Sequence, residues 1–554
     1  MKKDKRKIEG ITLIALVITI IVLLILAGVT IASLSGDNGI LARAKEAKKK
    51  TLESQKEEGK VLKDLEYYAS NIENKSAFNE KTKVNEPQLA TGMTRICFQE
   101  NGETYKTIKE GENGFDINNW YNYEQKQWAN MQTEDGSMWV WIPRFAYKIN
   151  NSNQTVDVKF LIDTSDNYYI SDTEIGTAKR QKTVDEVIDT TQGYTVHPAF
   201  TNESSIGFKN GGWDKELPGI WVAKFEAGYV NKELEKEQIK ASSVNYSHDT
   251  VWAYRTESGK TNEQGDKIDA IVEARNYLDG VYGAKKTAIK FPVFKGSTKE
   301  LPRYSMNYIS HKDAFNISKV LIEANNAYGL SGRTDSHLMK NSEWGATAYL
   351  GKSQYGLNGQ AVVTNNKNLN SNPTSAYAQP GYDYSVNGKG PWNQWNKVEN
   401  IKTASTTETV YGVFDMVGGT WERTAAYINN GNGNLNNYGS SFTKNGSTKY
   451  VTAYPFDAEK DKSESDYDIK SKANYIVNNE KFGIYGDAVR ETSIAGAGAT
   501  SWDGDFSYFP ALDSPFFLRG GSYWYGSTAG LLASHRNTGI SYCDGGFRPV
   551  LVVL

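Results

Sequence analysis

"VYGVFDMVGGTWERTAAYI" (residues 410–428) is the stretch that decides the fold. β-Branched and aromatic residues recur in it around a glycine pair, which is typical of strands. Two more strand signals follow it, "FFLRGGSYW" (516–524) and "FRPVLVVL" (547–554). The C-terminal part of the chain is therefore predicted to be rich in β-structure.

The same composition appears earlier, in "MWVWIPRFAYKI" (138–149) and "GIWVAKFEAGYV" (219–230). Two helices are expected after these strands. One, "HKDAFNISKVLIEANNAYG" (311–329), has an apolar stripe of Ala314, Ile317, Leu321 and Ala324, and the other, "NSEWGATAYLGKS" (341–353), starts from a Ser342 cap. Residues 229–290 and 430–500 are polar and rich in Asn, Lys and Ser, which predicts insertions or long loops on a compact α+β core.

The totals exclude several classes of protein. A net charge of -2, from 63 basic and 65 acidic residues, gives no reason to expect nucleic acid as a partner of the whole chain. Two cysteines, Cys97 and Cys543, are too few for a disulfide framework or a cysteine-based zinc site, although one bridge between them stays an alternative. The histidines are scattered without metal-ligand spacing, so no metal site is expected: His197, His248, His311, His337 and His535.

The N-terminus carries a basic stretch followed by an apolar run without charge, residues 11–34. This run is long enough to cross a bilayer as a helix and too long for the apolar region of an ordinary cleaved signal. Residues 35–70 continue with helical periodicity and predict a stalk, and the polar residues 71–88 predict a linker. We expect residues 1–10 to be a leader before this membrane helix.

The junction "KIEGITLIALVITI" resembles the processing segment of type IV prepilins and pseudopilins. The resemblance implies that a prepilin peptidase cuts after Gly10 and that the new N-terminal residue, Ile11, is methylated. It also implies other pilin subunits as partners. The family usually has a glutamate where this chain has Ala15, and that glutamate helps subunits dock during assembly. The resemblance therefore favours processing more than assembly into a filament.

The body of the chain, residues 89–554, resembles the formylglycine-generating-enzyme-like (sulfatase-modifying-factor) domain, a variant of the C-type lectin fold. The matching residues are Glu343-Trp344, Asp415-Met416, Trp421-Glu422, Arg519-Gly520-Gly521 and Gly546-Phe547-Arg548. The expected fold is thus α+β, with a long N-terminal helix, a C-type-lectin-like head and long loop insertions.

The resemblance does not extend to catalysis. Catalytic members hold copper with two cysteines near the C-terminus, and this chain has Cys543 alone in that region, so no enzymatic activity is expected. A structural calcium near Glu422 is compatible with the family, but Gly419 stands where the enzymes have a ligand asparagine. No cofactor is therefore predicted.

Residues 519–549 also resemble the variable segment of C-type-lectin-fold proteins diversified by retroelements. The resemblance makes the ends of the segment scaffold, namely Arg519, Gly520, Gly521, Gly546, Phe547 and Arg548, together with an inward Trp524. Its candidate ligand-binding residues are Ser522, Tyr523, Tyr525, Ser527, His535, Arg536, Asn537, Ser541, Tyr542, Cys543 and Asp544. Tyr, Ser, Gly and Asn dominate antibody paratopes, because tyrosine offers large contact area at small entropic cost.

These features together predict a surface-displayed binding protein. It would be a single-pass protein of the cell membrane with its head outside, associated with a pilus if it is assembled, and it would bind an extracellular protein or glycan. The alternative from another class is a structural minor pilin without ligand diversification, and a formylglycine-generating-type enzyme ranks third.

Overall fold

The computed structural model describes the chain in separate ranges. These are 18–23, 43–52, 54–55, 58–59, 62, 77–181, 188–202, 210–228, 293–294, 309–323, 326, 328–362, 398, 401, 405–443, 448–454, 484–493, 498–522, 525–540 and 545–554. The chain divides into two compact units, Met1–Tyr67 and Tyr68–Leu554, and each is described by itself.

In the first unit, residues 18–23 are helical with exposed side chains, and residues 43–52 form another helical piece. Lys50 and Glu46 lie one turn apart on that piece and form an ion pair of 3.0 Å. Within the described ranges no helix combines the length and the apolar character that a membrane crossing needs. The predicted span 11–34 is described at residues 18–23 alone, and the predicted cleavage site, Gly10-Ile11, lies outside the described residues.

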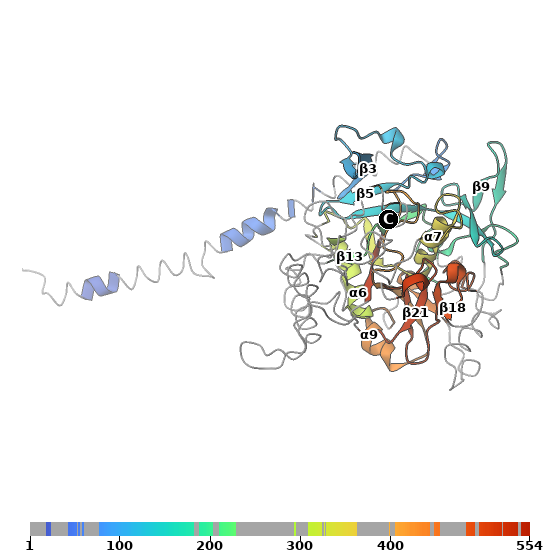
Figure 1. The fold of residues 1–554 in the computed structure, drawn as a ribbon. Coiled ribbons are helices and arrows are strands. Elements are labelled where there is room, and N and C mark those ends of the chain that lie inside the picture. The colour runs from blue at the N-terminus through green and yellow to red at the C-terminus, as the bar shows by residue number, and fades with distance from the viewer. Residues whose placement is uncertain are drawn as a thin grey trace, which may run out of the picture. The chain divides into compact units, whose positions relative to one another are not determined.

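The second unit is built mainly from β-sheets, with few helices (Figure 1). The described residues form one seven-stranded sheet in the order β15-β23-β12-β6-β5-β3-β4. Its strands are β15 (Thr334–Leu338), β23 (Pro549–Val553), β12 (Gly219–Ala223), β6 (Met138–Pro143), β5 (Asn130–Thr133), β3 (Met93–Glu100) and β4 (Tyr105–Lys109). Every neighbouring pair is antiparallel. The last strand of the chain lies inside this sheet, so hydrogen bonds on both sides hold the C-terminus in place.

The centre of this sheet explains the continuous apolar runs in the sequence. Every residue of β6 and of β12 is buried, as expected where both faces of a strand are covered. Trp141 and Trp221 are direct partners in the register of these strands, and their ring centroids lie 5.2 Å apart. The predicted run 138–149 divides into β6 and β7 (Phe145–Asn150), because Arg144 between them turns its buried side chain to other partners.

A second seven-stranded sheet carries the C-terminal motifs, with the described strands in the order β17-β16-β20-β21-β19-β18 and β22 also paired to β16. Its strands are β17 (Thr452–Tyr454), β16 (Trp421–Ile428), β20 (Phe516–Arg519), β21 (Ser534–Asn537), β19 (Phe506–Ser507), β18 (Gly498–Ala499) and β22 (Gly545–Phe547). This sheet is mixed: β16 runs antiparallel to β20 but parallel to β17 and β22.

Smaller sheets and short helices complete the described part of the unit. The small sheets pair β11 (Thr195–Val196) and β8 (Thr155–Phe160) with β7, β1 (Phe78–Asn79) with β2 (Val84–Asn85), β9 (Asn167–Tyr169) with β10 (Ile175–Thr177), and β13 (Ala227–Gly228) with β14 (Val293–Phe294). The 3-10 helices are η1 (Ile117–Asn119), η2 (Tyr123–Gln125), η3 (Pro198–Phe200), η5 (Val320–Ile322), η6 (Thr448–Tyr450), η8 (Trp502–Gly504) and η9 (Gly526–Thr528). The α-helices are α6 (His311–Lys319), α7 (Asn341–Lys352) and α9 (Gly433–Thr443).

The two helices expected from the sequence are present with different ends. In α6 and η5, Ala314, Ile317 and Leu321 are buried as the stripe predicts, while Ala324 lies outside the described residues. The predicted Ser342 cap is wrong. Helix α7 begins at Asn341 after Lys340, and the Glu343 carboxylate accepts the backbone N–H of Lys340 at 2.9 Å. This bond is one half of a capping box, in which a glutamate at the third helical position accepts the N–H of the capping residue.

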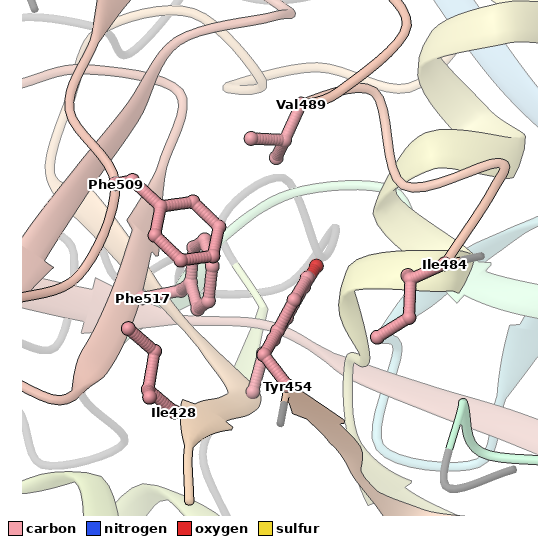
Figure 2. Packing of buried hydrophobic residues seen from close by; sticks show 7 residues of the cluster. Ile428, Tyr454, Ile484, Val489, Phe509 and Phe517 are labelled. Carbon is pink, nitrogen blue, oxygen red and sulfur yellow. The ribbon is translucent and has the colours of Figure 1, made fainter. Parts of the chain in front are cut away.

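Two described parts of the polar range 430–500, predicted as an insertion or long loop, supply core residues, while residues 455–483 lie outside the described residues. Figure 2 shows Tyr454, Ile484 and Val489 packed with Phe509 and Phe517 in one buried cluster. Isolated apolar residues among many polar ones give no periodic signal, so only their convergence reveals the cluster. The other predicted insertion, 229–290, lies outside the described residues.

Part of the predicted linker 71–88 is folded into the second unit. Strands β1 and β2 form a hairpin in which Val84 and Asn85 are buried. The Asn85 amide donates to the carbonyl oxygens of Asp163 (2.8 Å) and Pro218 (3.1 Å). A buried asparagine that links two distant carbonyls looks like a loop residue in the sequence, so the sequence gives no sign of this contact.

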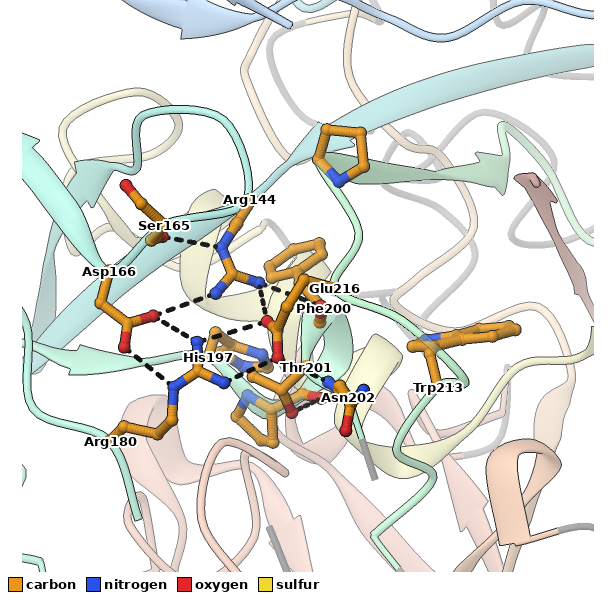
Figure 3. Close-up of polar contacts among 12 residues, drawn as sticks. Arg144, Ser165, Asp166, Arg180, His197, Phe200, Thr201, Asn202, Trp213 and Glu216 are labelled. Atoms are coloured by element: carbon orange, nitrogen blue, oxygen red, sulfur yellow. Dashed lines mark hydrogen bonds and ion pairs between the residues drawn. The ribbon is translucent and has the colours of Figure 1, made fainter. Parts of the chain in front are cut away.

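A ring of four alternating charges locks the loops beside β7. Figure 3 shows Arg144 and Arg180 facing Asp166 and Glu216. Arg144 contacts Asp166 at 3.2 Å and Glu216 at 2.8 Å, and Arg180 contacts Glu216 at 2.7 Å. Since Arg144 is fully buried, loss of either carboxylate would leave a desolvated cation with only part of its compensating negative charge.

Candidate ligand-binding surface

The segment 519–549 runs from the end of β20 through η9 and β21 to β22 and β23. Strands β20 and β21 are antiparallel, with Phe517 opposite Arg536 and Leu518 opposite His535. Strand β22 then pairs with β16, so both ends of the segment lie on the central strand of the second sheet. The residues between them are held on a hydrogen-bonded frame.

Arg519 anchors the start of the segment. It is fully buried, and its guanidinium donates to the carbonyl oxygens of Ala533 (2.9 Å), Asp487 (2.8 Å) and Ala488 (2.9 Å). Burial lowers the pKa of Arg519 to about 10, which still leaves it charged at neutral pH. One side chain thus ties the residue just before β21 to the loop that precedes β18.

The two glycines after Arg519 adopt backbone angles that other residues rarely take. Gly520 has φ +84° and Gly521 has φ +80°. A Cβ at Gly520 would lie 2.9 Å from the carbonyl oxygen of Met416, and one at Gly521 would lie 2.5 Å from the Cβ of Ala529. The chain can therefore turn here only with glycine.

Arg548 anchors the end of the segment on β16. Its Nε donates to Glu422 Oε2 at 2.7 Å, its Nη2 donates to Glu422 Oε1, and it also donates to the carbonyl oxygens of Ala223 (2.9 Å) and Phe414 (3.0 Å). Burial by itself would lower the pKa of Arg548, but the Glu422 carboxylate holds that pKa above its usual value. Arg548 lies between β22 and β23, so this ion pair ties the link between those strands, which belong to different sheets, to β16. Just before Arg548, Gly546 and Phe547 lie buried in β22, opposite Glu422 and Arg423.

The geometry around Glu422 differs from that of a metal ligand. Both carboxylate oxygens of Glu422 face the Arg548 guanidinium, so a calcium ion would have to compete with a bidentate pair. At Gly419 a Cβ would lie 2.8 Å from Glu226 Oε1, which already accepts the Thr420 N–H at 2.9 Å. An asparagine at that position would therefore displace Glu226. The described residues contain no group of three or more His, Cys, Asp or Glu side chains placed to hold a metal.

A cluster of rings and one cation, which we call the aromatic patch, lies on β19, β21 and the adjoining residues. It consists of Phe506, Tyr508, Tyr525, His535 and Arg536, and each of these side chains is partly exposed. Phe506 stacks on His535, with centroids 5.3 Å apart and planes 9° apart, and on Tyr508 at 4.5 Å and 26°. Tyr525 meets Phe506 edge-on at 5.0 Å, and the Arg536 guanidinium lies 5.5 Å from the Tyr508 ring centroid.

Trp421 forms the floor of the patch. It is buried, it lies at the start of β16, and its ring centroid is 4.9 Å from that of Tyr525 and 5.2 Å from that of His535. The rings above it are therefore fixed by packing as well as by strand pairing. Such preorganised rings lose little entropy when a partner covers them.

His535 is neutral in this setting. Burial lowers its pKa, and its Nδ1–H donates to the carbonyl oxygen of Arg536 at 2.7 Å. The flat, uncharged imidazole can stack on Phe506, while Arg536 supplies the positive charge of the patch.

The other predicted binding residues are placed differently. Ser527 is exposed in η9 beside the patch. Ser522 is fully buried, and Asn537 is nearly so, accepting from Arg423 Nη1 at 3.1 Å and from the Gly539 N–H at 2.7 Å. Ser522 and Asn537 thus belong to the frame in this structure rather than to the contact surface, because the turn after Gly520-Gly521 and the register of β21 direct them inward. Six predicted residues lie outside the described residues: Tyr523, Trp524, Ser541, Tyr542, Cys543 and Asp544.

Two members of the patch, Phe506 and Tyr508, were not expected from the sequence. They precede the segment, and the parallel pairing of Ser507 in β19 with Ser534 in β21 brings them beside His535. The short "FSY" run at 506–508 alternates like a strand, but nothing local to it indicates its partner. Cys97, the cysteine of the described ranges, is half-buried in β3, and burial raises the pKa of its thiol.

The chain matches no protein-family model, and it matches no curated protein. Among solved structures it is similar to Treponema denticola variable protein 1, with 13% sequence identity and a TM-score of 0.22. The match covers 60% of this chain and 85% of that chain. A likeness at this level carries no argument about fold or function.

Proposed function

We propose that this chain is an envelope-anchored display protein whose lectin-like head binds an extracellular protein or glycan through the aromatic patch and the neighbouring residues of segment 519–549. In this proposal the apolar run 11–34 is a single membrane helix with the head outside the cell. A prepilin peptidase removes the leader after Gly10, and residues 35–70 form a stalk.

The observation that carries the proposal is the partly exposed stack of Phe506, Tyr508, Tyr525 and His535 on a buried tryptophan floor. Aromatic rings and arginine are the side chains that contribute most to binding at interfaces, particularly when their own position is fixed. The partly exposed rings, the Arg536 guanidinium and the exposed Ser527 of η9 together offer apolar contact, charge and hydrogen bonds.

No catalytic role is part of the proposal. The copper chemistry of the enzymes that the head resembles needs a pair of thiolates near the C-terminus, and the sequence supplies Cys543 alone there. Nor does the net charge of -2 favour nucleic acid.

The first test compares binding by the full-length protein in detergent with binding by a Tyr508→Ala, Tyr525→Ala variant, on a glycan array and on a panel of intact cells. We expect the variant to lose at least about tenfold in affinity, since both rings are partly exposed and held in place by contacts with Phe506. A Tyr105→Ala variant, changed at a partly exposed tyrosine of edge strand β4, is the matched control and should bind like the parent. Equal binding by all three proteins would refute the assignment of the patch.

The alternative, a structural minor pilin, is supported by the prepilin-like junction and weakened by Ala15. Mass spectrometry of the mature N-terminus tests cleavage after Gly10, and isolation of filaments tests assembly. Diversification is tested in DNA: a nearby near-copy of the segment encoding 519–549, differing mainly at adenines and accompanied by a reverse-transcriptase gene, would support it. Without such a copy the proposal reduces to a fixed binding surface.

A further inference from the structure

A second candidate site is a cleft of about 460 Å³ formed by residues outside segment 519–549. Its walls come from the end of β7, the loop at 188–191, the loop at 485–493 and helix η8. The volume falls within the ~300–1,000 Å³ typical of small-molecule sites. No residue of the aromatic patch lines it.

The floor of the cleft is apolar and rigid. Ile149, Ile188, Tyr485 and Trp502 line it, and all four are more than nine-tenths buried. The Tyr485 hydroxyl accepts the backbone N–H of Ile188 at 2.9 Å, which fixes two of these walls to each other. The small accessible parts of these side chains are thus held in a set position.

One wall carries a carboxyl group whose orientation is fully determined. Glu491 Oε1 accepts the Tyr147 hydroxyl at 2.8 Å, and Oε2 accepts the Tyr349 hydroxyl at 2.7 Å and the Gly486 N–H at 2.6 Å. Residue Glu491 is half-buried and lines the cleft. Three donors hold this group, so it can act as a fixed hydrogen-bond partner without reorganisation.

The rim of the cleft is polar and carries both signs of charge. Asp189 and Arg490 lie on it, together with the Ser493 hydroxyl. The Asp189 carboxylate is held by the Thr191 N–H (2.9 Å) and hydroxyl (2.6 Å), and the Arg490 guanidinium lies 4.9 Å from the Tyr485 ring centroid. The described lining residues therefore include one cation and two carboxyl groups.

We propose that this cleft binds a neutral carbohydrate unit, a mono- or disaccharide. A pyranose has one face of C–H groups, which suits the apolar floor, and a rim of hydroxyls, which suits fixed acceptors and donors such as Asp189, Arg490 and Glu491. An anionic ligand such as a phosphate would meet two carboxyl groups, and a purely apolar ligand would leave the polar rim without partners. The proposal does not depend on the aromatic patch.

The cleft is nonetheless joined to the strand that carries the patch. The Ser493 and Ser507 hydroxyls lie 2.9 Å apart, and Ser507 stands between Phe506 and Tyr508. A sugar in the cleft and a partner on the patch would therefore occupy neighbouring walls of the same framework.

The test uses the full-length protein in a detergent without a sugar headgroup. Saturation-transfer NMR is recorded with glucose, galactose, mannose and N-acetylglucosamine, and with inorganic phosphate as the charged probe. We expect transfer to the ring C–H protons of at least one sugar, with a dissociation constant at least about fivefold weaker in Asp189→Asn and in Arg490→Gln. Both residues lie on the accessible rim, so these conservative variants should unfold at the parent temperature.

The Tyr508→Ala, Tyr525→Ala variant separates this proposal from the previous one, because it should retain the sugar signal. Transfer to none of the four sugars, a signal unaffected by both rim variants, or competition by phosphate would each overturn the assignment. Loss of the sugar signal in the patch variant alone would place the sugar on the patch and likewise overturn it.

Discussion

Asp505 offers a sharp test of how the aromatic patch is supported. It immediately precedes β19, and its Oδ2 accepts the backbone N–H of Leu532 at 2.9 Å. Gly530 lies so close that a Cβ there would come within 1.8 Å of Asp505 Oδ1. Asp505 therefore holds the turn from which β21, with His535 and Arg536, departs.

Burial, and after it the charge of Asp503, raises the pKa of Asp505 from 3.8 to about 8. The folded protein thus keeps a proton on this group through a pH range in which the unfolded chain has released it. Because the raised pKa belongs to the folded state, the contribution of Asp505 to stability is fully present below about pH 4 and falls as pH rises toward 8. One pKa unit corresponds to about 1.4 kcal/mol, so the folded state loses about 3 kcal/mol between pH 5 and pH 7 through this one group.

Asp505→Asn removes this dependence. Asparagine has the same shape, does not titrate, and can still accept the Leu532 N–H through its amide oxygen. We expect the free energy of unfolding of the variant to rise by about 3 kcal/mol relative to that of the parent when both are moved from pH 5 to pH 7. Urea unfolding followed by tryptophan fluorescence measures the difference, since all 13 tryptophans lie in the second unit.

Other titrating groups contribute equally to both proteins and cancel in that difference. Asp513→Asn, at an exposed aspartate, is the matched control and should track the parent at every pH. Parallel pH profiles for the parent and Asp505→Asn would refute the reasoning, because they would show that Asp505 is ionised in the folded state as it is in the unfolded one.

Three further predictions concern the frame, and urea unfolding of the full-length protein measures each. Gly345→Ala should cost about 3 kcal/mol or more, because its Cβ would lie 1.9 Å from a facing carbonyl oxygen, whereas Gly433→Ala in α9, with open space, should change stability by less than about 1 kcal/mol. Arg548→Met should cost about 3–5 kcal/mol, since it leaves Glu422 buried and unpaired. Tyr454→Phe should cost about 1–3 kcal/mol, because its hydroxyl joins two buried side chains.

The outcomes that would contradict these predictions are specific. Equal stability of the two glycine variants would show that the close approach in α7 relaxes freely. Unchanged stability of Arg548→Met would mean that water or another donor reaches the carboxylate. Unchanged stability of Tyr454→Phe would mean that Asn341 and Asp487, the two partners of the hydroxyl, pair with each other.

The sequence could predict those features that depend on neighbouring residues. Runs of β-branched and aromatic residues indicated the buried strands β6 and β12, and an apolar stripe at helical spacing indicated α6. The second helix, α7, was also expected, although the Ser342 cap on which that prediction rested is wrong. The glycine pair after Arg519 marked a turn, because a left-handed backbone favours glycine whatever the rest of the chain does. Local sterics and side-chain periodicity act over a few residues, so a linear pattern records them.

Only the tertiary structure decided which residues share a surface. Phe506 joins His535 through a parallel strand pair, Ser522 turns inward behind two glycines, and Asn85 leaves a predicted linker to bridge distant carbonyls. Tyr454 and Ile484, isolated in polar sequence, meet in the core. Strand register and packing are settled by contacts between residues far apart in the chain, and no local pattern encodes the partner.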